Sequence, residues 1–247
     1  MSLPFLTSRR KAGLRPTSPN AGLTDLHCRI LPGFNDGPET LEQSVALIRQ
    51  LHKTGFRRLI ATPHVMRGFY APSPDQVRVV TAQVRQAIQA EGIEVSVVAA
   101  AEYYVDEGLL TTLRSRADLL LFSPSRSTPE SLLLVETSLI TIPDSWMELI
   151  ELLSNRGLVP VLAHAERYVY LQRNRDLAFF LRRQGVKFQI DLPSLMGRNG
   201  TNPQHLAEWF IEQDLVSYIG SNAQSENHLR DVKQALTLPH GRLATRG

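Results

Sequence analysis

The chain contains a single cysteine, Cys28, among its 247 residues. An intrachain disulfide is therefore excluded, and the composition suits a reducing compartment, so we expect a cytoplasmic protein. The chain also lacks a run of about 18 apolar residues, the length that a membrane-spanning helix requires. We therefore expect no transmembrane span.

Acidic residues are missing from the first 23 positions, where Arg9, Arg10, Lys11 and Arg15 are found. The formal net charge of +3 comes from this segment. Because the rest of the chain is slightly acidic, a basic surface for nucleic acid is not indicated. Residues 1–22 are rich in Pro, Ser and Gly, and we interpret them as a flexible basic leader, since a stable membrane anchor needs more basic residues or a lipid.

Sequence repeats of about 20 to 50 residues are absent too, which excludes a solenoid. Instead, short apolar or β-branched segments alternate with amphipathic ones from residue 23 onward, as is typical of a parallel α/β sheet or barrel. We predict seven βα units forming one domain over residues 23–238, a C-terminal tail at 239–247 and a surface loop at 114–130. The strands are predicted at 23–30, 57–62, 94–101, 131–136, 159–163, 186–191 and 216–221, and the clearest helices at 40–54, 75–91, 144–156, 174–184 and 203–213.

Polar residues gather at the predicted carboxyl ends of these strands, which in a βα barrel converge on one face. Any one histidine there is more readily explained by a structural hydrogen bond, but the joint pattern indicates a metal or acid–base site. The residues are His27, Arg29, Asp36, His64, Glu102, Glu136, His164, Glu166, Arg167, Gln189, Asp191, Asn222 and Gln224.

Cys28 offers an alternative chemistry, because its neighbours His27 and Arg29 would lower the pKa of a thiol. A cysteine phosphatase would place a Cys-x5-Arg loop at this point, and none follows Cys28. The alternation of side chains along a strand also points Cys28 away from its two neighbours. The sequence therefore argues against a cysteine nucleophile.

Several separated motifs resemble the polymerase and histidinol phosphatase (PHP) superfamily, over nearly all of residues 24–237. Residues 25–37, DLHCRILPGFNDG, are similar to its opening motif D-x-H-x-H-(I/L)-(L/I)-P-G-x-D-D-G, and ATPH at 61–64 is intact. Residues 163–167, AHAER, match A-H-P-E-R with alanine for proline, and SNAQ at 221–224 stands where the superfamily has S-D-x-H. Within the superfamily the chain resembles the bacterial capsule-type tyrosine phosphatases.

This resemblance implies a distorted seven-stranded, TIM-like (βα)7 barrel that binds up to three divalent ions, often manganese, and hydrolyses phosphomonoesters. It assigns the first ion to His27, position 29, Glu102 and position 222. It assigns the second to Glu102, Glu136 and His164, and the third to Asp36, His64 and position 224. By the same resemblance Arg167 stabilises the charge that develops on the phosphoryl group.

Three of these ligand positions are altered, because the chain has Arg29, Asn222 and Gln224 there. Arginine is a permanent cation without a lone pair to donate, and an amide oxygen is a weaker ligand than a carboxylate or imidazole. We therefore expect divalent metal at fewer than three sites, down to one or none. Arg29 either pairs with Glu102 in place of the ion or turns into solvent, and with Arg167 it is a candidate catalytic residue.

The sequence thus predicts a protein-tyrosine phosphatase of the PHP type with reduced or lost activity, linked to capsule or exopolysaccharide regulation. The expected partner is a phosphotyrosine protein or peptide, such as the tail of a polysaccharide-biosynthesis tyrosine kinase. The alternative is a non-catalytic module that binds phosphotyrosine through Arg29 and Arg167. Tyr168 and Tyr170, or Phe69 and Tyr70, either shape the mouth of the site for a phosphotyrosine ring or pack in the ordinary way.

Overall fold

The computed structural model describes residues 22–34, 36–123 and 130–238. The predicted leader, apart from Gly22, the predicted tail and residues 124–129 of the predicted loop lie outside this range. Among the described residues no helix is long and apolar enough to cross a membrane.

Nine parallel strands in two sheets form the centre of the described part of the chain. One sheet has the order β1-β2-β4 and the other β3-β5-β6-β7-β8-β9. Parallel neighbours require crossover connections, and helices supply most of them. The strands are β1 (Leu23–Cys28), β2 (Phe56–Ala61), β3 (His64–Val65), β4 (Ser96–Ala99), β5 (Glu102–Tyr104), β6 (Ser131–Glu136), β7 (Leu158–Leu162), β8 (Lys187–Asp191) and β9 (Val216–Gly220).

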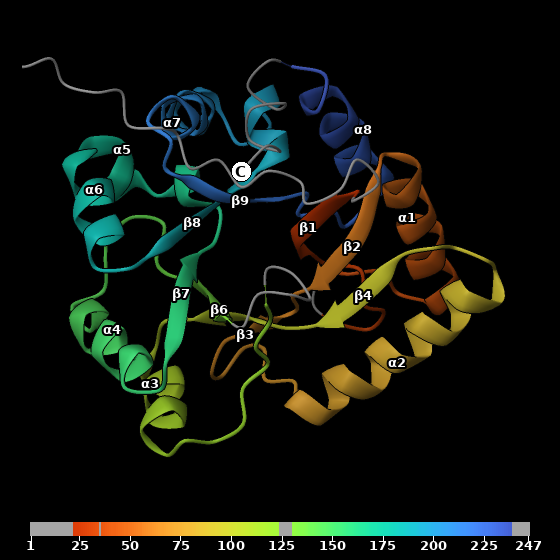
Figure 1. Cartoon of the computed structure of the whole chain (residues 1–247), viewed down its shortest axis with the longest axis horizontal. Helices are drawn as coiled ribbons and strands as arrows, with labels where there is room; N and C mark the ends of the chain where they lie inside the picture. Colours follow the sequence, from red (N-terminus) through yellow and green to blue (C-terminus); the bar gives the residue numbers. More distant parts are fainter. Residues whose placement is uncertain (1–21, 35, 124–129, 239–247) are drawn as a thin grey trace, which may run out of the picture.

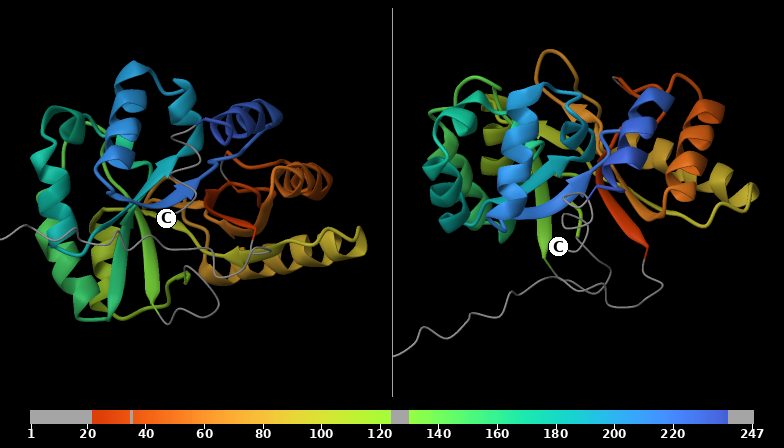
Figure 2. Two further views of the ribbon diagram at one scale, coloured as in Figure 1. Left: turned by 45° about the horizontal axis from the view of Figure 1, so that its top comes forward. Right: turned by 90° about the horizontal axis from the view of Figure 1, so that it is seen from above.

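Eight α-helices accompany these strands among the described residues, and two short 3-10 helices cover Ala165–Arg167 and Leu192–Met196. Helices α1 and α2 lie beside β1, β2 and β4, while α4 to α7 surround β6 to β9 (Figures 1 and 2). The α-helices are α1 (Leu41–Lys53), α2 (Pro74–Ala90), α3 (Glu107–Arg114), α4 (Trp146–Ser154), α5 (Val169–Arg173), α6 (Asp176–Arg183), α7 (Thr201–Glu212) and α8 (Glu226–Ala235).

The α/β class and the parallel pairing agree with the sequence-based prediction, but the count of seven strands does not. At two predicted strands a second short strand follows after two intervening residues, so that β2 precedes β3 and β4 precedes β5. Pro63 stands in the first break, and proline has no backbone N–H to continue a ladder. Single hydrogen bonds bridge the breaks, from Ala100 N–H to the Ala61 carbonyl and from Glu102 N–H to the Pro63 carbonyl, both at 2.9 Å.

Local sequence explains where the two longest helices begin. Thr40 and Ser73 cap α1 and α2, and in each the side chain three residues later, Gln43 or Gln76, bonds back to the cap. This reciprocal pairing satisfies two backbone N–H groups that a helix start otherwise leaves unbonded. Each helix then buries one apolar stripe against the sheet, as the spacing of Val45, Ile48 and Leu51 predicts.

The strands separate two layers of apolar side chains. The larger layer lies between the strands and the helices, and Ile48, Leu133 and Phe210 belong to it. The smaller layer is built mainly from strand residues, and it includes Leu26, Leu132 and Leu134. Above this second layer, at the carboxyl ends of the strands, buried side chains become polar.

Candidate active site

Glu102, the first residue of β5, is the centre of the polar cluster and is fully buried. Its Oε2 atom lies 2.9 Å from Nη2 of Arg29, 3.1 Å from Nε2 of His64 and 3.2 Å from Nε2 of His27. Its Oε1 atom lies 3.0 Å from Nε2 of His164. One carboxylate therefore contacts two residues that lie in strands, in β1 and β3, and two that follow strands, after β1 and after β7.

Glu136, the last residue of β6, faces two of the same histidines. Its two oxygens lie 3.4 Å from Nε2 of His64 and 3.4 Å from Nε2 of His164. His64, Glu102, His164 and Glu136 thus form a ring in which imidazole and carboxylate alternate; we call these residues the four-donor ring. Within this ring, His64, Glu102 and Glu136 offer ligand atoms that all lie within 4.8 Å of one another, so these three residues are the part of the ring with the spacing of a single divalent site.

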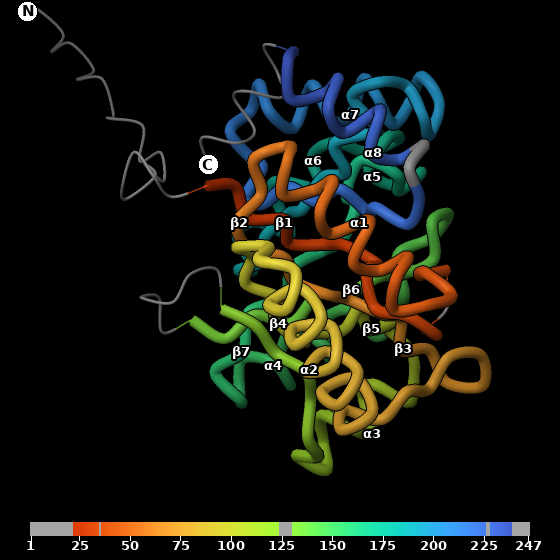
Figure 3. Tube along the Cα trace, turned by 90° about the vertical axis from the view of Figure 1, so that its right-hand side faces the viewer, coloured from red at the N-terminus to blue at the C-terminus, as the bar shows by residue number. Residues whose placement is uncertain are grey.

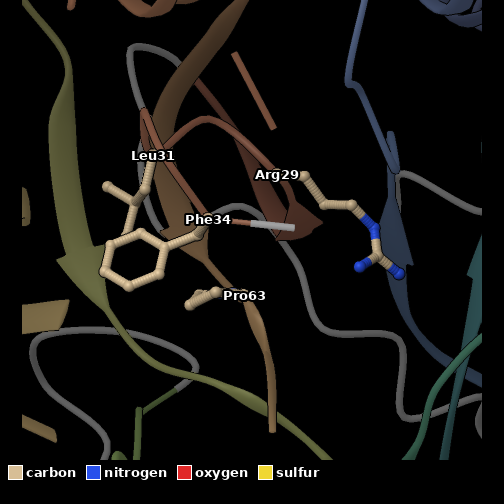
Figure 4. A pocket seen from close by; sticks show the side chains of 4 residues that line it. All are labelled: Arg29, Leu31, Phe34 and Pro63. Carbon is tan, nitrogen blue, oxygen red and sulfur yellow. The ribbon is translucent and has the colours of Figure 1, made fainter. Parts of the chain in front are cut away.

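Arg29 does not turn into solvent, and 6% of the residue is exposed. Besides the contact with Glu102, its Nε donates to Oδ1 of Asn222 at 3.0 Å and its Nη2 lies 2.8 Å from Nε2 of His64. Figure 4 shows the side chain pointing away from Leu31, Phe34 and Pro63, which line a small pocket with it, toward the segment after β9. The guanidinium therefore lies among the site residues.

A second layer of polar residues lies beside this one, and it includes Gln189 and Asp191, which the sequence analysis listed at a strand end without assigning them a role. Gln189 accepts from the backbone N–H of His164 at 2.8 Å, is 3.2 Å from Nδ1 of His27, and donates to Oδ1 of Asp191 at 3.0 Å. Asn222 donates to Oδ2 of Asp191 at 3.0 Å. The available signal was the alternation of Gln189 and Asp191 with Phe188 and Ile190, which places both polar side chains on one face of β8.

Gly220 permits this layer to pack. A Cβ atom at this position would lie 2.6 Å from Nε2 of Gln189 and 2.7 Å from Cβ of His27. Because such distances are below van der Waals contact, only glycine lets β9 approach this closely. The glycine thus fixes the distance between the segment carrying Asn222 and the imidazole of His27.

Glu166 and Asp25 are buried carboxyl groups outside the four-donor ring. Burial and the nearby charge of Asp191 raise the pKa of Glu166 to about 7, while Ser194 donates to it at 2.6 Å. Burial raises the pKa of Asp25 to about 6, against the hydrogen bond from the Ser221 backbone at 2.9 Å. Both groups support neighbouring loops rather than the ring itself.

Arg167, at the end of the 3-10 helix after β7, is partly buried. Its charge helps to lower the pKa of Asp191, against the effect of burial and after the larger contributions of His27 and His164. Among the described residues its guanidinium makes no hydrogen bond or ion pair. Its donors are therefore available to an anion, which those of Arg29 are not.

The third predicted metal position is the least assembled. The Asp36 side chain is 53% exposed, and its ion-pair partner is Arg29 at 3.9 Å. Gln224 donates weakly to Oδ1 of Asn222 at 3.5 Å. His64, which the resemblance assigned to this position, lies with Glu102 and Glu136, and the ligand atoms of these three residues are all within 4.8 Å of one another.

Cys28 faces the apolar layer, as the alternation predicted. Its thiol donates to the carbonyl of Ile60 at 3.3 Å, and burial, together with Asp25, raises its pKa well above the usual value. A buried thiol that stays protonated is a poor nucleophile. The structure therefore gives no support to a cysteine mechanism.

Charge pairing controls protonation in the ring. Burial alone would raise the pKa of Glu102, but His27, Arg29 and His164 hold it well below its usual range. Burial likewise opposes ionisation of Glu136, whereas hydrogen bonds from His164 and His64 bring its pKa down to about 2. For His164 burial lowers the pKa, and the two carboxylates outweigh it and raise the pKa to about 10.

Raising the pH is therefore expected to destabilise the metal-free protein. His164 titrates at about 10 when folded, against 6.5 as its ordinary value. The folded state holds this proton more tightly, so the contribution is complete below about pH 6.5 and is lost up to about pH 10, with a slope of at most about 1.4 kcal/mol per pH unit. Urea unfolding in a chelator across this range measures the slope, and His164→Gln should remove it. A slope that persists in that variant would contradict the assignment to His164.

The donor set fits one divalent ion and not three. Imidazole and carboxylate suit borderline and hard cations, and the four-donor ring offers two of each. The buried Nε2 of His27 makes no hydrogen bond of good geometry among the described residues. At the first ion's position, however, Arg29 contacts Glu102 and Asn222, two of the residues that the resemblance assigns to that ion, and it also contacts Nε2 of His64 in the ring.

Comparisons with known proteins identify the family. The family model for capsular polysaccharide synthesis proteins of the CpsB/CapC type matches residues 23–237. The chain belongs to the CpsB/CapC family. This confirms the resemblance to capsule-type tyrosine phosphatases of the PHP branch that the motifs indicated.

Relatives in this family are named tyrosine phosphatases. The chain is 28% identical to tyrosine-protein phosphatase YwqE of Bacillus subtilis over 82% of its own length and 78% of the relative's. It is 27% identical to tyrosine-protein phosphatase CpsB of Streptococcus pneumoniae, with 81% and 82% of the two chains covered.

Solved structures give the same result. One solved structure comes from work on YwqE of Bacillus subtilis and CpsB of Streptococcus pneumoniae, which are described as metal-dependent tyrosine phosphatases. It superimposes with a TM-score of 0.76 at 27% identity and covers 87% of this chain and 86% of the other. The phosphotriesterase homology protein of Escherichia coli, complexed with phosphate, has a TM-score of 0.56 at 13% identity with 93% of both chains covered. The second likeness extends to the fold alone.

Proposed function

We propose that this member of the CpsB/CapC family is a phosphotyrosine phosphatase that works with a single divalent ion and with reduced activity. The observation that carries the proposal is the close cluster of His64, Glu102 and Glu136 within the four-donor ring, next to which Arg29 pairs with Glu102. Manganese is the ion that the family resemblance favours. The expected substrate is a phosphotyrosine protein of capsule or exopolysaccharide synthesis, such as a tyrosine kinase of that process.

In this proposal the site residues have separate roles in metal binding, phosphate binding and positioning. An ion in the four-donor ring would lower the pKa of a bound water and polarise a phosphoryl oxygen. Arg167 has unused donors and binds the phosphoryl oxygens, where it stabilises the charge of the transition state. Arg29 neutralises Glu102 and holds its Oε2 atom in place. Gln189 orients His27 and the backbone of His164.

Reduced activity follows from the contacts of Arg29. Its permanent charge stands where the resemblance expects an ion, and it repels a second cation brought close to it. A guanidinium cannot activate water as a metal ion does. We expect the loss of an ion that activates the nucleophile to lower the rate by several factors of ten. Each factor of ten corresponds to about 1.4 kcal/mol in the activation barrier.

Metal analysis together with a manganese-supplemented phosphotyrosine-peptide assay tests the proposal. We expect about one ion per chain and slow turnover, and Glu136→Ala should lower both, the turnover by roughly tenfold or more. Glu151→Ala, an exposed glutamate of α4, is the matched control and should change neither. Three ions per chain with rapid turnover would show that Arg29 hardly reduces metal binding or activity. Absence of turnover at full metal loading would contradict the proposal that the protein is a phosphatase.

The alternative is a non-catalytic module that binds phosphotyrosine. The free guanidinium of Arg167 favours it, whereas Arg29 would have to leave Glu102 and Asn222 to contact a phosphate. This reading expects phosphopeptide affinity without turnover, lost in Arg29→Ala and Arg167→Ala. Equal affinity for the phosphorylated and the plain peptide would exclude it.

Two further expectations accompany the proposal. We infer that the two sheets are parts of one distorted barrel, because Asn222 N–H donates to the His27 carbonyl at 2.8 Å and so connects the ends of β9 and β1. We also keep the expectation of a cytoplasmic location, which the single cysteine supports.

A further inference from the structure

A tight hairpin, Met66–Tyr70, follows β3 and projects from the side of the molecule on which the strands end (Figure 3). Met66 and Tyr70 pair across it in antiparallel fashion, with hydrogen bonds of 2.6 Å and 2.9 Å between their backbones. Gly68 occupies the turn with a φ of +81°, a conformation that favours glycine. The hairpin therefore has a defined shape of its own.

Asp106 ties this hairpin to the rest of the domain. One of its carboxylate oxygens accepts from the backbone N–H of Arg67 at 3.1 Å, and the other caps α3 by accepting from Leu109 N–H at 2.9 Å. Gly108 lies against the hairpin, because a Cβ there would be 3.0 Å from Cβ of Arg67. A loop held in this way loses little entropy when it binds a ligand.

The hairpin presents two aromatic side chains. Phe69 is 75% exposed, more than any other large hydrophobic side chain among the described residues. Tyr70 is 41% exposed, and its ring stacks on His64 with the centroids 5.8 Å apart and the planes 20° from parallel. Because His64 belongs to the four-donor ring, Tyr70 lies directly beside the proposed reaction centre.

The other aromatic pair near the site is used in packing. Tyr168 is fully buried and stacks on Tyr170 with centroids 5.0 Å apart. The phenol of Tyr170 bonds to the hydroxyl of Thr137 at 2.9 Å, and that of Tyr168 accepts from Thr137 N–H at 3.3 Å. Of the two pairs that the sequence offered, Phe69 and Tyr70 are the more exposed, since Tyr168 is fully buried and Tyr170 is partly buried.

We propose that Phe69 and Tyr70 form a platform that receives the phenyl ring of the substrate and so selects aryl over alkyl phosphomonoesters. The inference rests on the proposed function and assigns specificity within that site. In phosphotyrosine the ring follows the ester oxygen directly, so a phosphoryl group held at the four-donor ring brings the phenyl ring next to Tyr70. In phosphoserine a single methylene and then the peptide backbone take that place, with no ring to stack.

The test compares two peptides of one sequence that differ only in phosphotyrosine or phosphoserine, with manganese present. Wild-type protein should prefer the phosphotyrosine peptide in kcat/KM. Phe69→Ala and Tyr70→Ala should each reduce this preference by about three- to tenfold, mainly through KM, since an aromatic pair contributes about that factor. Tyr70→Phe keeps the ring and should keep the preference. Val79→Ala, on an exposed position of α2, is the matched control.

The outcomes separate this inference from the proposed function. If turnover is too slow to measure, the ratio of the dissociation constants of the two peptides replaces the ratio of kcat/KM. An unchanged ratio in Phe69→Ala and Tyr70→Ala, with wild-type protein still acting on or binding phosphotyrosine, overturns the platform alone. A protein that neither hydrolyses nor binds either peptide overturns both.

Discussion

A variant that combines Arg29→His, Asn222→Asp and Gln224→His is expected to hold more metal and to hydrolyse a phosphotyrosine peptide roughly a hundredfold faster than the wild-type protein. Arg29 blocks the first ion by contacting Glu102 and Asn222, and these substitutions remove its charge and supply imidazole and carboxylate ligands. The gain is expected because Glu102 and His27 are already buried in place. Metal content measured after dialysis and kcat with manganese check the prediction.

Each of the single substitutions is expected to leave the metal content and the rate of hydrolysis close to those of the wild-type protein. Asn222→Asp alone would set a second carboxylate where the amide now donates to Asp191 at 3.0 Å, and the like charges would repel. Arg29→His alone removes the permanent cation beside Glu102. The effects should therefore be strongly non-additive. Arg183→His, at an exposed position of α6, controls for the loss of charge, and unchanged metal content in the triple variant would contradict the prediction.

Glu102→Gln is expected to lower the free energy of unfolding of the metal-free protein by about 3 to 5 kcal/mol, the usual cost of removing one partner from a buried ion pair. The substitution leaves Arg29 and His164 buried without the carboxylate they share. Urea unfolding in a chelator near neutral pH measures the loss.

Glu136→Gln provides the comparison for this prediction. Its side chain is 17% exposed, while that of Glu102 is fully buried, so solvent partly compensates and the loss should be smaller. Glu151→Gln should have no effect. Equal stability of Glu102→Gln and wild-type protein would mean that Glu102 does not hold the cluster together.

Much of this protein follows from its sequence alone. The alternation of apolar segments predicted an α/β fold with parallel strands, because periodicity reports which face of each element is buried. The motifs identified the family and placed His27, Arg29, His64, Glu102, Glu136 and His164 at strand ends. Their convergence required only that parallel strands end on the same side.

Other features were decided by tertiary structure. The chain has nine described strands and not seven, because two predicted strands are each interrupted; Pro63 explains the first break, and the second lies at Ala100 and Ala101 where the sequence has no strand breaker. Gln189 and Asp191 acquire their role only through neighbours that are distant in sequence. The direction of Arg29 was open between solvent and Glu102, and burial among carboxylate, amide and imidazole groups settled it. The residue types determined that a cation and a set of metal ligands would be present. Packing determined that His64 lies with Glu102 and Glu136, because spacing along a chain does not specify the distances between strands.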